Sequence, residues 1–187
     1  GDLALNQDSV DNFVKWKKLT NLVSRIQILE QNESTYEALG TYWLVLAQSY
    51  YENGNYTKCL EAIEKYNSIS SRIFRKDYEY ANTLPYAILA AQEVYKYDNA
   101  KYIEYASQCV KEILNNTDSD DWSSHYFVAL VYMDLYGKTE KTEYLNSAYD
   151  IALNNVTYLV DEQKSLNEIW LSDVVEVKAS SDATKQE

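Results

Sequence analysis

Residues 42–66 constrain the fold most, because they carry two apolar stripes at helical spacing on either side of a short polar turn. Apolar residues that recur at i, i+3, i+4 and i+7 lie on one face of an α-helix. Two amphipathic helices joined by so short a turn fold back on each other in antiparallel fashion. The stretch therefore predicts a helical hairpin, with one stripe at Trp43, Leu46, Ala47 and Tyr50 and the other at Tyr56, Cys59, Leu60, Ile63 and Tyr66.

The landmark residues of this hairpin resemble the tetratricopeptide repeat. The landmarks are Trp43, Leu46, Ala47, Tyr50, Gly54, Asn55, Tyr56 and Cys59. In that family the large Trp fills the space between the two helices, the Ala permits their close approach and the Gly permits the turn. The resemblance implies an all-α fold in which antiparallel hairpins stack into a right-handed superhelix.

The rest of the chain repeats the pattern in degenerate form. Leu89 and Ala90 echo Leu46 and Ala47, Val128 and Ala129 do so again, and turns are expected at residues 97–99 and at Gly137. The landmark alanines, Ala47, Ala90 and Ala129, are 43 and 39 residues apart, whereas the family period is about 34 residues. We predict one domain over residues 1–178, with a flanking helix at 9–30, hairpins at 35–66, 83–116 and 122–155, a capping helix at 157–178 and a polar tail at 179–187. The apolar residues of 9–30 come in two phases, so this helix either contacts different neighbours along its length or kinks near Thr20 and Asn21.

Glycine and proline are scarce: the 187 residues include four Gly and one Pro. Turn-rich β folds need many more of both, so the composition also favours helices. The formal net charge is −12, which disfavours a nucleic-acid partner because phosphate binding requires a basic surface. The same charge makes anionic membrane surfaces unfavourable partners and leaves basic peptides open. No apolar run is long enough to insert directly into a membrane.

Residues that could carry chemistry are few, and we predict neither an enzyme nor a bound metal or cofactor. His125 is the single histidine, so a His-based metal set or catalytic triad has at most one candidate. Residues 118–121 resemble the start of a calcium loop, but the later ligand positions are absent, and we interpret these acids as a helix cap. Cys59 and Cys109 lie on inner stripes and are interpreted as small buried thiols.

The remaining candidate is a recognition surface. In tetratricopeptide-like hairpins, the residues of the first helix that point away from its partner line a groove for extended peptides. Transferred to this chain, the resemblance implies partner-binding roles for Gln48, Tyr51, Glu52, Tyr95, Tyr126 and Asp134. Tyrosine suits such a surface because it offers apolar area and a polar tip at little cost in entropy. We therefore predict a non-catalytic scaffold that binds a protein or peptide partner.

An alternative function is glycan binding by an exported bacterial accessory protein or lipoprotein, through sugars stacked on surface aromatics. Nineteen tyrosines and several Asn-X-Ser/Thr triplets favour an extracytoplasmic location. A signal or lipid anchor upstream of Gly1 is compatible with that location.

Overall fold

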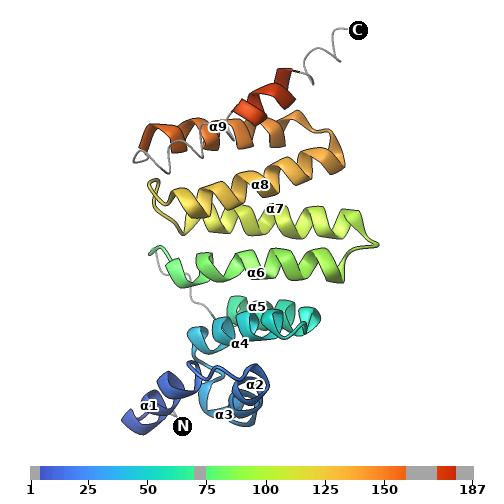
Figure 1. Ribbon diagram of the computed structural model, residues 1–187. Helices are drawn as coiled ribbons and strands as arrows, with labels where there is room; N and C mark the ends of the chain where they lie inside the picture. Colours follow the sequence, from blue (N-terminus) through green and yellow to red (C-terminus); the bar gives the residue numbers. More distant parts are fainter. Residues whose placement is uncertain (1–4, 70–74, 159–171, 180–187) are drawn as a thin grey trace. The chain divides into compact units, whose positions relative to one another are not determined.

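The computed structural model describes residues 5–69, 75–158 and 172–179, which are helical and contain no strand. The all-α prediction is therefore confirmed for the described part of the chain. Residues 172–179 form a short helix that follows the labelled ones. The labelled helices are α1 (Gln7–Trp16), α2 (Leu22–Gln31), α3 (Glu33–Tyr36), α4 (Gly40–Glu52), α5 (Tyr56–Ile69), α6 (Tyr78–Val94), α7 (Asn99–Asn115), α8 (Trp122–Thr139) and α9 (Thr142–Tyr158) (Figure 1).

The chain divides into two compact units, Gly1–Tyr105 and Ala106–Glu187. Helix α7 contributes its first residues to the first unit and the rest to the second. The single domain over 1–178 and the right-handed stacking of hairpins stay predictions.

In the first unit, α4 and α5 form the antiparallel pair that residues 42–66 predict. Gly40 begins α4, and a Cβ placed on it would lie 3.1 Å from the ring of Tyr66 near the end of α5. At the other end of the pair, the ring centroids of Tyr51 and Tyr56 are 5.8 Å apart. Trp43 is only 7% exposed, and its indole Nε1 donates to the backbone oxygen of Glu37 at 2.8 Å. The large indole is thus part of the core, as the tetratricopeptide resemblance implies.

Helix α6 packs against both helices of this pair. Tyr80 of α6 stacks on Tyr66 of α5 with 4.5 Å between ring centroids, and Tyr86 of α6 lies 5.4 Å from Tyr51 of α4. Helix α4 is covered on a further side by α2, since the Tyr42 hydroxyl donates to the backbone oxygen of Leu29 at 2.8 Å. Little of the surface of α4 is left for solvent.

The predicted N-terminal helix at 9–30 is wrong as one helix, because residues 17–21 separate α1 from α2. Each helix has its own cap: the side-chain oxygen of Asn6 accepts from Ser9 N at 2.8 Å, and that of Asn21 accepts from Ser24 N at 2.9 Å. The two phases of apolar residues in this stretch therefore belong to two helices that start independently.

Two predicted boundaries are also wrong. Helix α6 begins at Tyr78 rather than near residue 83, because the Asp77 side chain caps it by accepting from Tyr80 N, and Pro85 lies inside the helix. Gly137 lies inside α8 instead of marking the turn, which falls at Glu140 with a φ of 56°. The Thr139 hydroxyl donates to the backbone oxygen of Leu135 at 2.7 Å in this last turn of α8.

In the second unit, α8 and α9 form another antiparallel pair. Tyr132 stacks on Tyr144 near the turn, and the side-chain nitrogen of Asn155 donates to the backbone oxygen of Trp122 at the far end. Val174, in the helix at residues 172–179, is fully buried and packs with both helices. The predicted capping helix at 157–178 starts where α9 still continues, and its residues Leu159, Leu166 and Trp170, like most of the polar tail, lie outside the described residues. The packed residues of this core are Ala129, Leu145, Ala148, Ala152 and Val174.

Gly54 and Gly137 should respond oppositely to substitution by alanine. Gly54 ends the α4–α5 turn with a φ of +77°, so Gly54→Ala is expected to destabilise the protein by about 1 kcal/mol. Gly137 lies in α8 and nothing lies within 4 Å of its Cβ position, so Gly137→Ala is expected to stabilise the protein by up to about 1 kcal/mol. Urea unfolding followed by circular dichroism measures both, and shifts of the same sign would contradict these backbone assignments.

Candidate functional site

The six residues predicted to bind a partner fall in both units. Gln48, Tyr51 and Glu52 lie on α4 and Tyr95 follows α6, in the first unit, while Tyr126 and Asp134 lie on α8 in the second.

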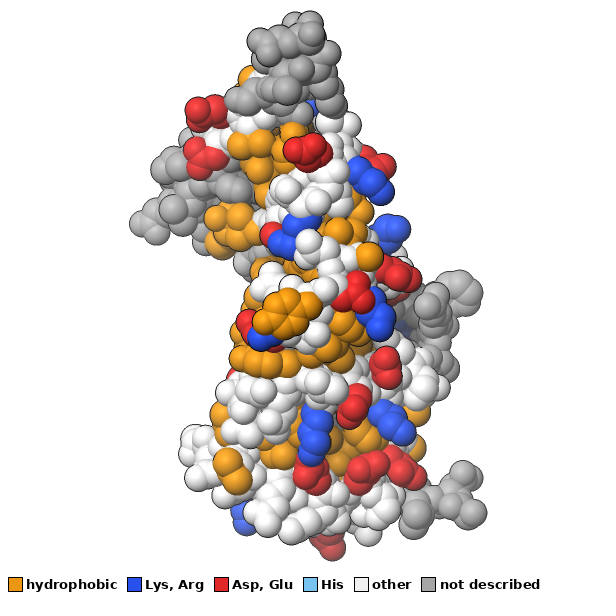
Figure 2. All heavy atoms as spheres, turned by 90° about the vertical axis from the view of Figure 1, so that its right-hand side faces the viewer, with side chains coloured by type: hydrophobic (Ala, Val, Ile, Leu, Met, Phe, Trp, Pro, Cys, Tyr) orange, Lys and Arg blue, Asp and Glu red, His pale blue; other side chains and the backbone are white. Residues whose placement is uncertain are grey.

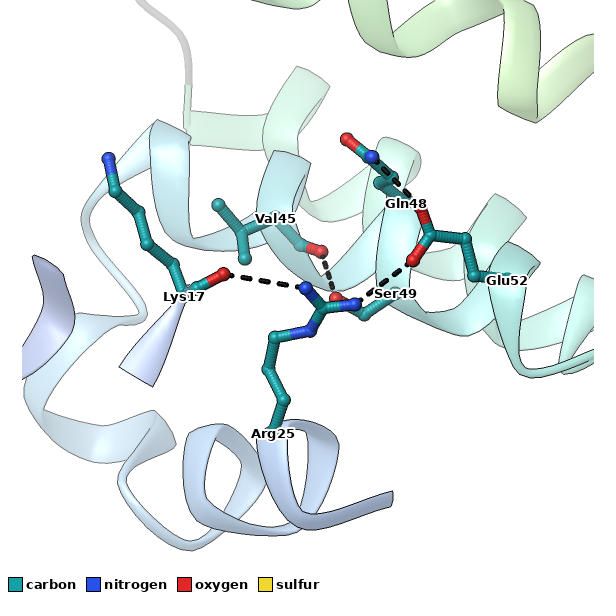
Figure 3. Close-up of polar contacts among 6 residues, drawn as sticks. All are labelled: Lys17, Arg25, Val45, Gln48, Ser49 and Glu52. Carbon is teal, nitrogen blue, oxygen red and sulfur yellow. Dashed lines mark hydrogen bonds and ion pairs between the residues drawn. The ribbon is translucent and has the colours of Figure 1, made fainter. Parts of the chain in front are cut away.

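Gln48 and Glu52 belong to a polar network that fastens α2 to α4 (Figure 3). Arg25 of α2 donates through Nη2 to Glu52 Oε2 at 3.0 Å and through Nη1 to the backbone oxygen of Lys17 at 3.4 Å. The other carboxylate oxygen of Glu52 accepts from Gln48 Nε2 at 3.0 Å. The side chain of Arg25 is only 16% exposed, so the carboxylate of Glu52 serves first to neutralise a largely buried guanidinium.

A second contact between the same helices involves Tyr50 and Glu30. The Tyr50 hydroxyl donates to Glu30 Oε1 at 2.6 Å, and Lys58 Nζ lies 3.2 Å from the same oxygen. The hydrogen bond from Tyr50, together with Lys58, lowers the pKa of Glu30 against the opposing effect of burial. Burial, and then the bond to Glu30, raises the pKa of Tyr50. At neutral pH, the pair is therefore a carboxylate and a neutral phenol.

Tyr51 is half-buried and meets two other half-buried tyrosines, Tyr56 at the start of α5 and Tyr86 of α6. The ring centroid of Tyr51 lies 5.8 Å from that of Tyr56 and 5.4 Å from that of Tyr86. We call these three residues the tyrosine trio. Three helices thus contribute aromatic rings to one partly exposed place, which is the densest aromatic feature near the predicted surface residues of the first unit.

The sequence pattern did not single out Tyr56 and Tyr86 as surface residues. The landmark alanines Ala47 and Ala90 suggest a shift of 43 residues between equivalent positions. The contacts between α4 and α6 do not follow this shift. Thr41 contacts Glu79, which is 38 residues later, and Tyr51 contacts Tyr86, which is 35 residues later. In the structure Tyr86 rather than Tyr95 lies beside Tyr51.

Tyr95 lies at the turn that follows α6, where it caps the helix. Its ring centroid is 6.1 Å from that of Tyr105, and Lys101 Nζ lies 5.8 Å from the ring. Its neighbours therefore come from α7, and it does not contact the tyrosine trio in any ring pairing of the described residues.

In the second unit, Tyr126 packs against the core between α8 and α9 and is only partly exposed. Asp134 accepts from Lys138 Nζ at 2.6 Å, one helical turn later. Leu130, on the same helix, is 41% exposed. Tyr126 and Asp134 stay predicted partner-binding residues, but each already has an intramolecular contact.

His125 is buried in the second unit, at 8% exposure. Its Nε2 lies 3.0 Å from the hydroxyl of Thr117, which in turn donates to the backbone oxygen of Ile113 at 2.8 Å. Since the hydroxyl proton is donated to the Ile113 oxygen, the Thr117 hydroxyl oxygen accepts a hydrogen bond from the N–H at His125 Nε2. This arrangement ties the loop before α8 to the end of α7 and suits a structural histidine.

The other sequence candidates for chemistry are structural in the described residues. Asp121 caps α8 by accepting from Ser124 N at 3.2 Å and from the Ser124 hydroxyl at 2.8 Å, so the predicted capping role is confirmed. Cys59 and Cys109 are buried free thiols, as predicted, and burial raises the pKa of Cys59 to about 12. Within the described ranges no set of three His, Cys, Asp or Glu side chains is placed to hold a metal ion.

A shallow hollow of about 660 Å³ lies between the start of α5 and the end of α6, beside the tyrosine trio. Two lysines, Lys58 and Lys96, contribute to its walls, and Tyr56 belongs both to the hollow and to the trio. The full lining is Gly54, Asn55, Tyr56, Thr57, Lys58, Glu93, Val94 and Lys96. Its size lies within the range of about 300–1,000 Å³ that is usual for ligand sites.

Comparison of the chain with protein-family models, with curated proteins and with solved structures gave no match. In the part of the chain that the structure describes, no helix has both the length and the apolar character that crossing a bilayer requires.

Proposed function

We propose that this chain is a non-catalytic, tetratricopeptide-like helical-repeat module that binds a protein or peptide partner through the tyrosine trio and the neighbouring residues of α4. The antiparallel α4–α5 pair, the packing of α6 against both of its helices and the buried Trp43 support the repeat architecture. The proposal rests on one observation: the ring of Tyr51 contacts those of Tyr56 and Tyr86 at a partly exposed place.

Tyrosine is well suited to partner recognition for a physical reason. Its ring buries a large apolar area, its hydroxyl can pair with a peptide amide, and few rotatable bonds are frozen on binding. Rings held by contacts with one another lose still less freedom when a ligand arrives. A peptide laid across the trio therefore gains contact area at a small entropic cost.

A random peptide library displayed on phage tests the proposal directly. Peptides enriched on the immobilised protein should bind it in solution, and the double variant Tyr51→Ala/Tyr86→Ala should weaken that binding at least about tenfold, as removal of two aromatic anchors does in other interfaces. Tyr78→Ala is the matched control, because Tyr78 is 50% exposed and is the first residue of α6, about two helical turns before Tyr86. It should leave binding unchanged within a factor of about two.

Because the trio is half-buried, a second double variant, Tyr51→Leu/Tyr86→Leu, keeps apolar packing while removing the rings and hydroxyls. Circular dichroism establishes that each variant retains its helices. Equal binding by the wild type and both double variants, or enrichment of no peptide, would refute the proposal. A panel of oligosaccharides in the same assay tests the alternative: glycan binding lost in the double variants would favour the exported glycan-binding function instead.

A further inference from the structure

We propose that the hollow between α5 and α6 is a specificity pocket for an acidic side chain, Asp or Glu, of the bound peptide. The inference rests on the proposed function, because it assigns a ligand group to a site beside the tyrosine trio. It goes beyond that function by naming the chemistry that the partner must carry.

The charge of the hollow is opposite to that of the chain. Among its lining residues, Lys58 and Lys96 are basic and Glu93 is the single acid, whereas the whole chain has a formal net charge of −12. Figure 2 shows lysine and acidic side chains interspersed on the face that it draws, without a large field of either sign. Two amines around one hollow are therefore a local feature, and their natural complement is a carboxylate.

Each amine lies over an aromatic ring, but only one of these rings is buried. Lys58 Nζ lies 5.4 Å from the centroid of the buried Tyr50, and Lys96 Nζ lies 5.2 Å from that of Tyr97, which is 92% exposed. A lysine that packs over a ring has less conformational freedom to lose when it binds a carboxylate. The two lysines come from different segments, Lys58 from α5 and Lys96 from the turn after α6, and both line the hollow.

Lys58 already has a carboxylate partner in Glu30, but this pair does not remove it from use. The side chains of Lys58 and Glu30 are 54% and 38% exposed. Such exposed pairs contribute little to stability because water screens them. An ammonium group has three N–H donors, so Lys58 can donate to a second carboxylate while it keeps its contact with Glu30.

The position of the hollow favours a peptide side chain as the source of that carboxylate. Tyr56 lines the hollow and belongs to the trio, so a peptide that crosses the trio passes the mouth of the hollow. Asn55 and Thr57 supply neutral hydrogen-bonding groups at the same wall, and Val94 supplies an apolar one. An extended peptide presents a backbone amide and carbonyl next to each side chain, which fits this mixed lining.

Fluorescein-labelled peptides of alternating glycine and a second residue, three repeats long, test the proposal by fluorescence anisotropy. With glutamate as the second residue, the wild-type protein should bind at least about tenfold more tightly than with glutamine or lysine. The double variant Lys58→Gln/Lys96→Gln should lose this preference, because two charge-assisted contacts are removed.

Lys65→Gln is the matched control, because Lys65 lies on α5, packs over the Trp43 ring at 6.0 Å and does not line the hollow. Lys65→Gln removes one positive charge, as does each of the single variants Lys58→Gln and Lys96→Gln with which it is compared, and it should leave the affinity unchanged within a factor of about two. An equal loss in Lys65→Gln would attribute the preference to overall charge and overturn the pocket. Absence of any preference for glutamate would also overturn the proposed pocket. Equally tight binding of tri-galacturonate would overturn it too, since the hollow would then select a sugar acid and not a peptide side chain.

Failure of this inference is distinguishable from failure of the proposed function. If library peptides bind through the trio but show no preference for glutamate, the proposed function is retained and the pocket for an acidic side chain is rejected. If the glutamate peptide binds and Tyr51→Ala/Tyr86→Ala has no effect on any peptide, the tyrosine trio is rejected as the binding site. The role of the hollow as part of that site is then rejected as well.

Discussion

Replacing Trp43 by alanine is expected to lower the free energy of unfolding by about 3–5 kcal/mol, the range for truncating a large aromatic side chain in a core. Trp43 is 7% exposed, its ring lies 4.9 Å from that of Tyr42 in an edge-to-face arrangement, and its indole N–H is paired with Glu37. Truncation removes this packing and leaves the Glu37 carbonyl without its donor. Urea unfolding followed by circular dichroism, which does not depend on the indole as a probe, measures the loss.

Trp16→Ala is the control for this prediction. Trp16 is half-buried and contacts Tyr36 edge-on at 6.1 Å. Because less of its surface is removed from water, its truncation should cost clearly less than that of Trp43. Equal losses for the two variants, or a loss below about 1 kcal/mol for Trp43→Ala, would contradict a packing role for Trp43 between the helices.

Leu145→Ala is expected to destabilise the second unit by about 2–5 kcal/mol, the range for leucine truncation in a packed core. Leu145 is 1% exposed and packs with Ala129, Ala148 and Val174. The core alanines are too short to fill the space that the leucine leaves, and the larger side chains packed against this core, such as Tyr126 and Met133, would have to leave their present positions to fill it. A cavity should therefore remain, which raises the cost above that of transfer to water alone.

Leu153→Ala provides a matched control on the same helix, since Leu153 is 48% exposed. It should change the free energy of unfolding by less than about 1 kcal/mol, because most of that side chain is already in contact with water. Hydrogen exchange at the amides of α8 and α9 reports on this unit specifically. Similar loss of protection in the two variants would be inconsistent with the core described here.

The sequence was most informative where local and tertiary requirements coincide. In residues 42–66 the helical period, the glycine at the turn and the large indole all favour the same hairpin, and Gly54 does adopt the positive φ that such a turn needs. Elsewhere, capping side chains decided the boundaries. Asn21 starts α2, close to the kink that the two apolar phases allow, whereas Asp77 starts α6 and is not distinguishable in sequence from other polar residues in a loop.

The candidate site was predictable only in part, for a geometric reason. Tyr51 was identified because its position within one hairpin follows from the pattern of that hairpin alone. Tyr86 and the hollow depend on how α6 sits against α4 and α5, and a shift of a few residues between helices exchanges one set of surface residues for another. Glu52 has the predicted position on α4, but its contact with Arg25 depends on the separate docking of α2.

Helices α4 and α5 lie antiparallel, with Trp43 buried in their core. A pair of distances between spin labels tests this arrangement most directly. Nitroxide labels placed at Ala38 and Lys65, and in a second sample at Asn53 and Lys65, give the two distances by pulsed electron paramagnetic resonance. The buried thiols of Cys59 and Cys109 should not be labelled in the folded protein. Ala38 and Asn53 lie on either side of α4, whose 13 residues span about 20 Å, and Lys65 lies near the end of α5. We predict that the Ala38–Lys65 distance is shorter than the Asn53–Lys65 distance by on the order of 10 Å. Equal distances, or the opposite order, would contradict the antiparallel pair and the recognition surface that is built on it.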